Sequence, residues 1–295
     1  ALVIEQVGRT TAPIPFIETT VLGALPVARF GSDEHKRDLL PRVASGELVL
    51  TAALVGDEPL RATPDGDGFR LTGTRLFVPA GQIADRVLVP AETADGDVRV
   101  VLVDPRAPGI AIDALDTTSG QPEAILHFEA VPVGAADALP GAVGATIVDW
   151  ITLRATAAQA SLALGVCEEA LALTAEYTKT RKQFDQPIAM FQAVGHRAAD
   201  AYVDTEAIRL TSWQAVWRIG AGMPAEAEVS VAKFWAAEGG KRVVHAATHL
   251  HGGVGVDRDY PVHRLFLYAR QLELTLGGSS THLLAIGRML ADEAA

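Results

Sequence analysis

The spacing of hydrophobic positions changes twice along the 295 residues, and these changes divide the chain into three predicted segments. In residues 1–47, apolar residues recur at helical spacing in short pieces that prolines interrupt. In residues 48–140, short β-branched and aliphatic runs alternate with turn residues, which is typical of an antiparallel β-barrel or sandwich. In residues 141–295 the spacing is helical again. The pattern predicts an α+β protein with N-terminal helices, a middle antiparallel β-barrel and a C-terminal four-helix bundle.

Local signals predict where several elements begin and end. Ser32 followed by Asp33 and Glu34 is a favourable helix start, because a capping hydroxyl and early acids satisfy the first turn. The sequence Asp-Gly-Asp-Gly at 65–68 predicts a tight turn between two strands. Trp213 and Trp217 are four residues apart and share a helix face, which we expect to lie in the core. Helices of the last segment are predicted at 147–178, 188–220, 224–250, 260–274 and 281–292.

Composition narrows the class of protein. The net charge is -11 and no Lys/Arg block occurs, which argues against a nucleic-acid partner. No apolar run reaches the ~18 residues of a membrane span, and we expect a soluble, cytoplasmic protein. The single Cys167 is expected to be a small buried hydrophobe in a reducing compartment. His245 and His249 share a helix face but lack a third ligand at useful spacing, so no metal site is expected.

The stretch 177–192 carries the candidate chemistry. It presents Arg181, Lys182, Gln183 and Phe184 together at a helix end, shortly before Pro187, which breaks the helix. A planar, permanently charged guanidinium suits a pair of phosphate oxygens. On physical grounds alone, a helix–helix turn whose cations complement the helix dipole explains these residues equally well.

The sequence of this stretch resembles the Arg-x-x-Phe-Gly-x-Pro-Ile-x-x-Phe-Gln signature of the acyl-CoA dehydrogenase family, with Asp185 in place of the family's glycine. A second match, His-Gly-Gly-Val-Gly at 251–255 followed by Tyr260-Pro261, resembles the family's Gly-Gly-x-Gly and Tyr-Pro block. The resemblance covers nearly the whole chain. It implies the family's three-part fold, in which residues 1–47 resemble the end of the N-terminal helical domain; either the sequence begins partway through that domain or this member has a shorter one. It also implies an acyl-CoA substrate, FAD, and an electron-transfer flavoprotein or similar acceptor.

The family's catalytic base is missing from both of its known positions. The reaction removes the α proton of an acyl-CoA with a carboxylate while the β hydride passes to FAD, so a base is essential. Most of the family has a Glu-Gly pair just before the last helix, and here Leu276-Gly277 stands there. A minority keeps the Glu on the long helix before the Arg181 motif, where this chain has Ala155. The nearest acid to the first position is Glu273, about one helical turn away.

The resemblance also implies a damaged pocket for the flavin ring. The family's Thr-Glu-Pro-x-x-Gly-Ser-Asp segment survives only as Asp-Glu-Pro at 57–59. The family's Trp-Ile-Thr strand, which covers the ring, is Phe77-Val78-Pro79 here, and proline has no N–H to donate. We therefore predict that this chain alone does not hold the ring well.

The residues that serve the ADP half of a neighbouring subunit's FAD are retained. By resemblance they are Arg181, facing the pyrophosphate, with Gln183, Phe184, His249, Gly252 and Gly253. His249 replaces the family's glutamine and still forms hydrogen bonds. We predict a non-catalytic subunit of a heteromeric acyl-CoA dehydrogenase, of the α2β2 type that acts in bacterial steroid side-chain breakdown. Its catalytic partner chain supplies the Glu and most of the flavin pocket.

Three rival readings are distinguishable. A flavin-dependent monooxygenase or oxidase of the same fold needs no α-proton base. It does need its own flavin pocket, and Phe77-Val78-Pro79 argues against such a pocket in this chain. A non-enzymatic acyl-CoA-binding scaffold needs no flavin, and the retained Arg181 argues against it. An active homotetramer that uses Glu273 requires the chain to shift by about one helical turn.

Overall fold

The computed structural model describes residues 1–293, and these form two compact units. One unit comprises residues 14–155, and the other comprises residues 1–13 with the described residues from 156 onward. Helices precede and follow a curled sheet in the chain, which confirms the predicted α+β class. The predicted domain boundaries at residues 47 and 140 do not coincide with these units, so the three-domain division stays a prediction. No helix in the described part is long and apolar enough to span a membrane.

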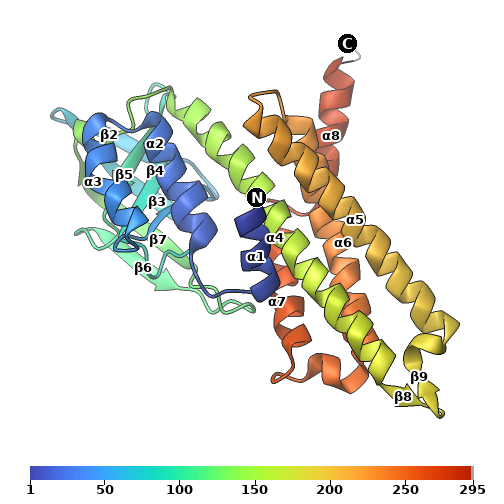
Figure 1. Ribbon diagram of the computed structural model, residues 1–295. Helices are drawn as coiled ribbons and strands as arrows, with labels where there is room; N and C mark the ends of the chain where they lie inside the picture. The colour runs from blue at the N-terminus through green and yellow to red at the C-terminus, as the bar shows by residue number, and fades with distance from the viewer. Residues whose placement is uncertain (294–295) are drawn as a thin grey trace. The chain divides into compact units, whose positions relative to one another are not determined.

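The unit of residues 14–155 is built on a seven-stranded sheet (Figure 1). Neighbouring strands follow the order β1-β4-β2-β3-β7-β6, with β5 paired to β4. The β1–β4 and β2–β4 pairs are parallel, whereas the other pairs are antiparallel. Parallel neighbours require a crossover, which local strand patterns do not reveal. The strands are β1 (Leu50–Ala52), β2 (Leu60–Asp65), β3 (Gly68–Val78), β4 (Arg86–Thr93), β5 (Val98–Val103), β6 (Ile110–Ala114) and β7 (Ala124–Val133).

The predicted turn and helix start are both present in this unit. Asp65 pairs with Gly68 across the β2–β3 turn, where Gly66 has a φ of 64° that a larger residue rarely adopts. The helix α3 (Asp33–Ala44) is capped by Ser32, whose Oγ accepts from the His35 N–H at 3.1 Å. The chain enters α3 through the π-helical η1 (Glu18–Ala24) and α2 (Leu25–Phe30).

The carboxyl group of Glu18 in η1 makes this unit's stability depend on pH. Burial, with a smaller contribution from Glu123, raises the pKa of Glu18 to about 7 from 4.5. The folded state therefore holds a proton that the unfolded chain releases, and the free energy of unfolding falls as pH rises from 4.5 to about 7. Glutamine does not ionise, so we expect the Glu18→Gln variant to avoid this loss, which is about 3 kcal/mol in the wild type once the pH exceeds about 7.

Urea unfolding of both proteins at pH 5 and pH 8 checks this expectation. The variant should gain stability over the wild type mainly at pH 8. An equal difference between the two proteins at both pH values would show that Glu18 ionises normally in the folded state.

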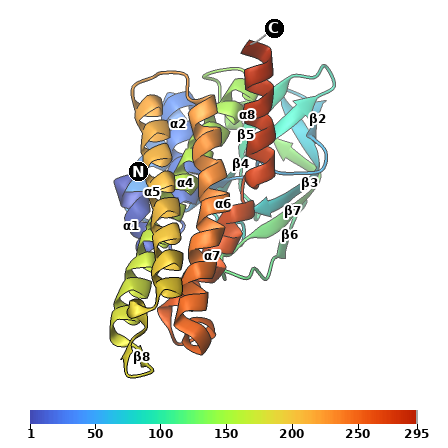
Figure 2. The ribbon, with the colours of Figure 1, turned by 90° about the vertical axis from the view of Figure 1, so that its right-hand side faces the viewer.

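The other unit is mainly helical, and its long helices match the predicted helices within a few residues (Figures 1 and 2). The long α4 begins before residue 156, so it contributes residues to both units. Tight contacts occur between α5 and α6, and α6 also packs against α7 and α8. The helices are α1 (Leu2–Thr10), α4 (Gly144–Thr180), α5 (Gln192–Gly220), α6 (Glu226–His251), α7 (Pro261–Leu274) and α8 (Ser279–Glu293).

Two glycines allow α1 to lie directly against α4. A Cβ on Gly8 would lie 2.2 Å from the Leu162 carbonyl oxygen, and a Cβ on Gly165 would lie 1.9 Å from the Glu5 carbonyl oxygen. Such distances are far inside van der Waals contact, so both positions require glycine. The Trp213 indole N–H donates a hydrogen bond to the Glu5 carboxylate at 3.0 Å, which also attaches α1 to α5.

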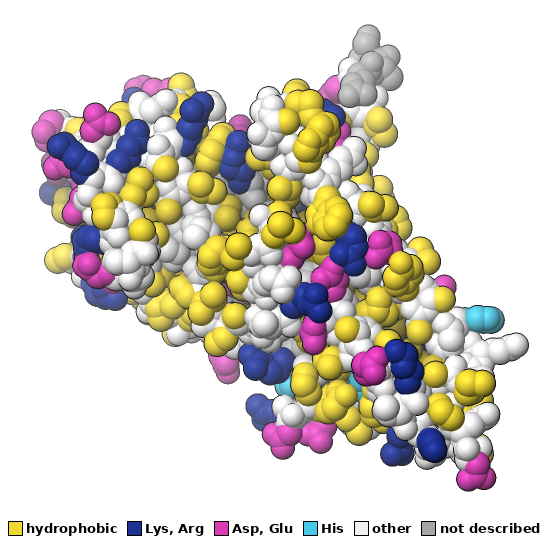
Figure 3. All heavy atoms as spheres, viewed as in Figure 1, with side chains coloured by type: hydrophobic (Ala, Val, Ile, Leu, Met, Phe, Trp, Pro, Cys, Tyr) yellow, Lys and Arg dark blue, Asp and Glu magenta, His cyan; other side chains and the backbone are white. Residues whose placement is uncertain are grey.

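We expected the two tryptophans of α5 to lie in the core, and this prediction is wrong. Trp213 is 45% exposed and Trp217 is 64% exposed, and Val203 and Leu210 are exposed on the same helix. Figure 3 shows hydrophobic side chains along this outer side of the helical unit. The spacing of the two tryptophans gave their common face correctly but could not show which way that face is turned. Cys167, by contrast, is fully buried as predicted.

Candidate functional site

The Arg181 motif forms a small hairpin between α4 and α5 (Figure 2). Strands β8 (Lys182–Gln183) and β9 (Gln186–Pro187) pair, and Phe184 and Asp185 form the turn with φ angles of 56° and 65°. Two successive left-handed residues define the tight turn that best matches strand twist. Aspartate tolerates this conformation better than most residues, so Asp185 replaces the family's glycine at small cost. The hairpin was not predicted, because two-residue strands leave no periodic pattern.

The hairpin presents an unpaired cation and an aromatic ring to solvent. Arg181, Gln183 and Phe184 are all exposed, and Phe184 is 88% exposed. No hydrogen bond or ion pair to the Arg181 guanidinium is present among residues 1–293. Phe184 contacts Phe191 edge to face, with ring centroids 6.2 Å apart. A guanidinium without an internal partner is available to an external anion.

An aromatic stack brings the ends of α4 and α6 together beside this hairpin. The Tyr177 and His251 rings are stacked at 4.4 Å, and Tyr260 lies 5.2 Å from His251. His251 is buried, its Nδ1 lies 2.8 Å from the Ala247 carbonyl, and burial lowers its pKa, so it is neutral at pH 7. Because Tyr177 precedes Arg181 by four residues and His251 directly precedes Gly252, the stack ties the two motifs together.

The glycines at the end of α6 leave the backbone open to a ligand. Gly252 has a φ of 61°, which requires glycine, and no atom of the described residues lies within 4 Å of a Cβ built on Gly252 or Gly253. His249 is exposed one turn earlier on α6. We call Arg181, Gln183, Phe184, His249, Gly252 and Gly253 the hairpin site. It combines a free cation, hydrogen-bonding groups and an uncovered backbone.

Leu276, which the resemblance places at the family's usual base position, lies in a strained loop between α7 and α8. Its φ is 57° and that of Gly277 is 96°, so two left-handed residues follow each other. The Leu276 carbonyl accepts a hydrogen bond from His282 Nε2 at 3.0 Å. This hydrogen bond helps to fix the backbone of the loop. The Leu276 side chain is a hydrocarbon and cannot accept a proton.

The nearby acid Glu273 is already engaged. Its carboxylate forms an ion pair with Arg270 on the same helix. Lys233, almost completely buried in α6, donates to the Leu272 carbonyl at 2.7 Å and the Glu273 carbonyl at 3.4 Å. Burial lowers the pKa of Lys233 to about 8, and the Glu273 carboxylate opposes this shift. Glu273 is therefore held by cations on two helices.

The strand expected to cover a flavin ring ends at a residue that cannot donate a backbone hydrogen bond. Phe77 has a φ of 49° at a β-bulge and is 56% exposed, and Pro79 lacks an N–H. The Pro79 carbonyl accepts from the buried Thr51 hydroxyl at 2.7 Å. Asp57 is exposed. Ala155, at the alternative base position, is 1% exposed on α4.

Sequence reasoning included Tyr177, His251 and Tyr260 in the two matched stretches but gave them no role in the hairpin site. Tyr177, His251 and Tyr260 form its aromatic support. Their aromatic character near the two motifs was the only available signal, because the stack joins residues more than 70 positions apart. The hairpin site belongs to the unit that contains the described residues from 156 onward, whereas β3 belongs to the unit of residues 14–155.

Comparison with known proteins assigns the class. Residues 144–291 match the acyl-CoA dehydrogenase C-terminal domain, and residues 1–47 match the acyl-CoA dehydrogenase N-terminal domain. The chain belongs to the acyl-CoA dehydrogenase family, which consists of FAD-dependent oxidoreductases that act on acyl-CoA.

Three relatives are especially similar. The chain is 44% identical to acyl-CoA dehydrogenase FadE27 of Mycobacterium tuberculosis, over 98% of this chain and 80% of the relative. The crystal structure of the ChsE4–ChsE5 complex from Mycobacterium tuberculosis matches at 46% identity and a TM-score of 0.93, over 98% and 79% of the two chains. A variant of the Tcur3481–Tcur3483 steroid ACAD matches at 42% identity and a TM-score of 0.90, over 99% and 80%.

The residues present fit one half of FAD better than the other. At the hairpin site, the unpaired Arg181 and the uncovered Gly252–Gly253 backbone suit a pyrophosphate and the ADP portion. At the strand that the resemblance places over the flavin ring, Pro79 has no N–H to donate to the ring.

Proposed function

We propose that this chain is the non-catalytic subunit of a heteromeric FAD-dependent acyl-CoA dehydrogenase. It completes the FAD site of a catalytic partner chain that supplies the Glu base. One asymmetry carries the proposal. The hairpin site is exposed and free to bind, whereas Leu276 and Ala155 occupy the two base positions and Pro79 ends the flavin-covering strand. An enzyme that has lost its function altogether is expected to lose the hairpin site together with the base and the flavin pocket. Retention of the hairpin site alone therefore supports a role toward the FAD of a neighbouring subunit.

Each residue of the hairpin site has a defined role in this proposal. Arg181 binds the pyrophosphate through its planar fork of donors. Gly252 and Gly253 bring backbone N–H groups close to the adenosine side. His249 forms a hydrogen bond there, and Phe184 with Gln183 excludes water from the edge of the site.

The bound FAD supplies hydride acceptance, and the partner's carboxylate removes the α proton. The substrate is an acyl-CoA, and we propose a steroid side-chain CoA ester as its class. Support for this class comes from the matched Tcur3481–Tcur3483 steroid ACAD. Support for the heteromeric state comes from the two matched complexes, each of which contains two different chains. An α2β2 assembly and an electron-transfer flavoprotein or similar acceptor complete the proposal.

A pair of substitutions tests which chain carries the base. In the purified complex, Glu273→Gln in this chain should leave turnover unchanged, because Glu273 is bound to Arg270 and lies outside the proposed chemistry. Replacing the partner's base by the corresponding amide should lower turnover by about 10²- to 10⁴-fold. If Glu273→Gln lowers turnover as much, this chain carries its own base and the proposal is wrong.

A further inference from the structure

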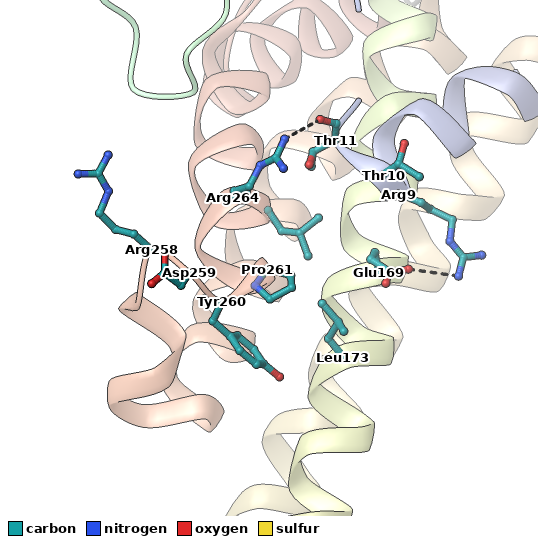
Figure 4. A pocket seen from close by; sticks show the side chains of 11 residues that line it. Arg9, Thr10, Thr11, Glu169, Leu173, Arg258, Asp259, Tyr260, Pro261 and Arg264 are labelled. Carbon is teal, nitrogen blue, oxygen red and sulfur yellow. Dashed lines mark hydrogen bonds and ion pairs between the residues drawn. The ribbon is translucent and has the colours of Figure 1, made fainter. Parts of the chain in front are cut away.

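Two surface features of the helical unit lie outside the hairpin site, a polar pocket and an apolar helix face. The pocket lies at the ends of α1 and α7 (Figure 4). There, Glu169 binds Arg9 at 3.3 Å, and Arg264 donates to the Thr11 carbonyl at 3.2 Å. Arg258 points away from these groups. The polar groups of the pocket are thus occupied or turned apart, whereas the apolar face, on α5, remains exposed.

This apolar face is a stripe of regularly spaced side chains. Val203, Leu210 and Trp217 recur every seven residues, so they lie nearly above one another on the helix. They are 62%, 64% and 64% exposed, and Trp213 beside them is 45% exposed. Figure 3 shows apolar side chains along this side of the helical unit. We call Val203, Leu210, Trp213 and Trp217 the α5 stripe.

The α5 stripe is large enough to take part in a protein interface. Its four side chains expose on the order of 500 Å² of mainly apolar surface, and contiguous patches of this size mark interaction sites. Two such stripes packed together remove ~1,000 Å² from water, which is the lower limit for a specific protein–protein interface. Tyr202, exposed on the same helix beside the stripe, adds to this area.

Charged residues beside the stripe are already neutralised within the chain. Arg209 forms ion pairs with Glu206 on the same helix and with Glu168 on α4. Arg218 forms an ion pair with Glu228 at 3.2 Å. An unpaired charge would oppose the formation of an interface, because it would have to be desolvated. Covering the stripe leaves none of these charges without its partner.

The stripe is bulky at one end and slim at the other. Trp213 and Trp217 lie in its C-terminal half, whereas Val203 and Ala207 lie in its N-terminal half. In two antiparallel α5 helices related by a two-fold axis at Leu210, each tryptophan meets a small side chain of the other copy. Trp217 meets Val203 and Trp213 meets Ala207, because the members of each pair are equidistant from Leu210. A parallel pair would set tryptophan against tryptophan.

We propose that the α5 stripe binds a second copy of this chain, as an antiparallel helix pair with Leu210 on the two-fold axis. Apolar residues at seven-residue spacing are the pattern with which two helices pack along one seam. A two-fold interface also requires a self-complementary patch, because the same residues serve both copies. The bulky and slim halves of the stripe meet this requirement.

The α5 stripe leaves the hairpin site free for the catalytic chain. Leu210 lies ~27 Å along α5 from Gln192, where the helix begins beside the hairpin. One surface therefore serves the catalytic chain while the other joins two copies of this chain. In the proposed α2β2 assembly this contact links the two halves, and that placement alone rests on the proposed function.

Sedimentation velocity of the purified chain, without flavin or partner, tests the proposal. The chain should sediment as a dimer at micromolar concentration. Leu210→Glu should weaken dimerisation at least about a hundredfold, because it brings two carboxylates together at the axis. Leu284→Glu, at a similarly exposed leucine of α8, should dimerise as the wild type does. Both leucines are exposed, so both variants should keep the wild-type circular dichroism.

Cysteine crosslinking tests the antiparallel register. A short bismaleimide should join two copies of Leu210→Cys, because their thiols face each other across the axis. It should not join two copies of Val203→Cys, whose thiols lie about 21 Å apart along the helix pair. The native Cys167 is buried and does not interfere.

Three results would each overturn the proposal: a monomeric lone chain, wild-type dimerisation by Leu210→Glu, or equal crosslinking of the two cysteine variants. A stripe that binds the catalytic chain instead gives a monomeric lone chain, and Leu210→Glu then disrupts the heteromeric complex. Because sedimentation uses the lone chain without flavin, its failure leaves the proposed FAD role untouched.

Discussion

Replacing Arg181 by alanine is expected to strip FAD from the complex of this chain with its catalytic partner, with a loss of affinity of about ten- to a hundredfold. The Arg181 guanidinium has no partner within the described chain, so in the proposed complex its donors are available to the pyrophosphate alone. Its removal leaves the anion without its fixed cation. Arg181→Lys should recover only part of the affinity, because an ammonium cannot reproduce the planar fork. Flavin absorbance after dialysis measures the effect.

Lys182→Ala is the matched control for this experiment. Lys182 is an exposed cation on the same hairpin, one residue away, and its loss changes the local charge equally. We expect this variant to keep its FAD. Both variants should melt at the wild-type temperature as lone chains, since both side chains are exposed. Retention of FAD by Arg181→Ala at wild-type affinity would remove Arg181 from the cofactor site.

Gly165→Ala should produce the largest loss of stability, on the order of 3 kcal/mol or more. The new methyl would sit 1.9 Å from the Glu5 carbonyl oxygen, and backbone cannot yield as a flexible side chain does. Relief requires α1 to move off α4, which also breaks the hydrogen bond between Trp213 and Glu5. Chemical denaturation followed by circular dichroism measures the change, and tryptophan fluorescence reports the new environment of Trp213.

Gly287→Ala provides the control for this substitution. Gly287 lies inside α8, and no atom of the described residues is within 4 Å of an added Cβ. Alanine there should stabilise the helix by up to about 1 kcal/mol through its better helix propensity. If Gly165→Ala unfolds at the same denaturant concentration as the wild type, the close α1–α4 contact does not exist in solution.

Local patterns predicted the helices well, because each long helix carries its own periodicity and end signals. The α3 cap at Ser32 and the turn at Gly66 were predicted for the same reason. The parallel β1–β4 pair and the contact of α1 with α4 were not, since both join segments far apart in the chain. Trp217 was assigned to the core because spacing reveals a shared face but not its surroundings.

The candidate site shows the same division. The Arg181 and Gly252 motifs were found by resemblance, and the structure adds that Arg181 is unpaired and that the Gly252 backbone is uncovered. The support of the site by stacked Tyr177 and His251 depends on packing between α4 and α6, which sequence does not encode locally. The roles of these residues toward FAD remain a proposal that the substitutions above test.

The central claim is that this chain serves a cofactor that it cannot hold alone. Flavin content and native mass test it most directly, measured on the chain purified by itself and after co-expression with the acyl-CoA dehydrogenase encoded beside it. The account predicts a colourless lone chain and a yellow complex with one FAD for every two chains. A lone chain that purifies yellow with one FAD per chain would contradict it. The flavin pocket at Asp57 and Pro79 would then be functional despite its missing donors.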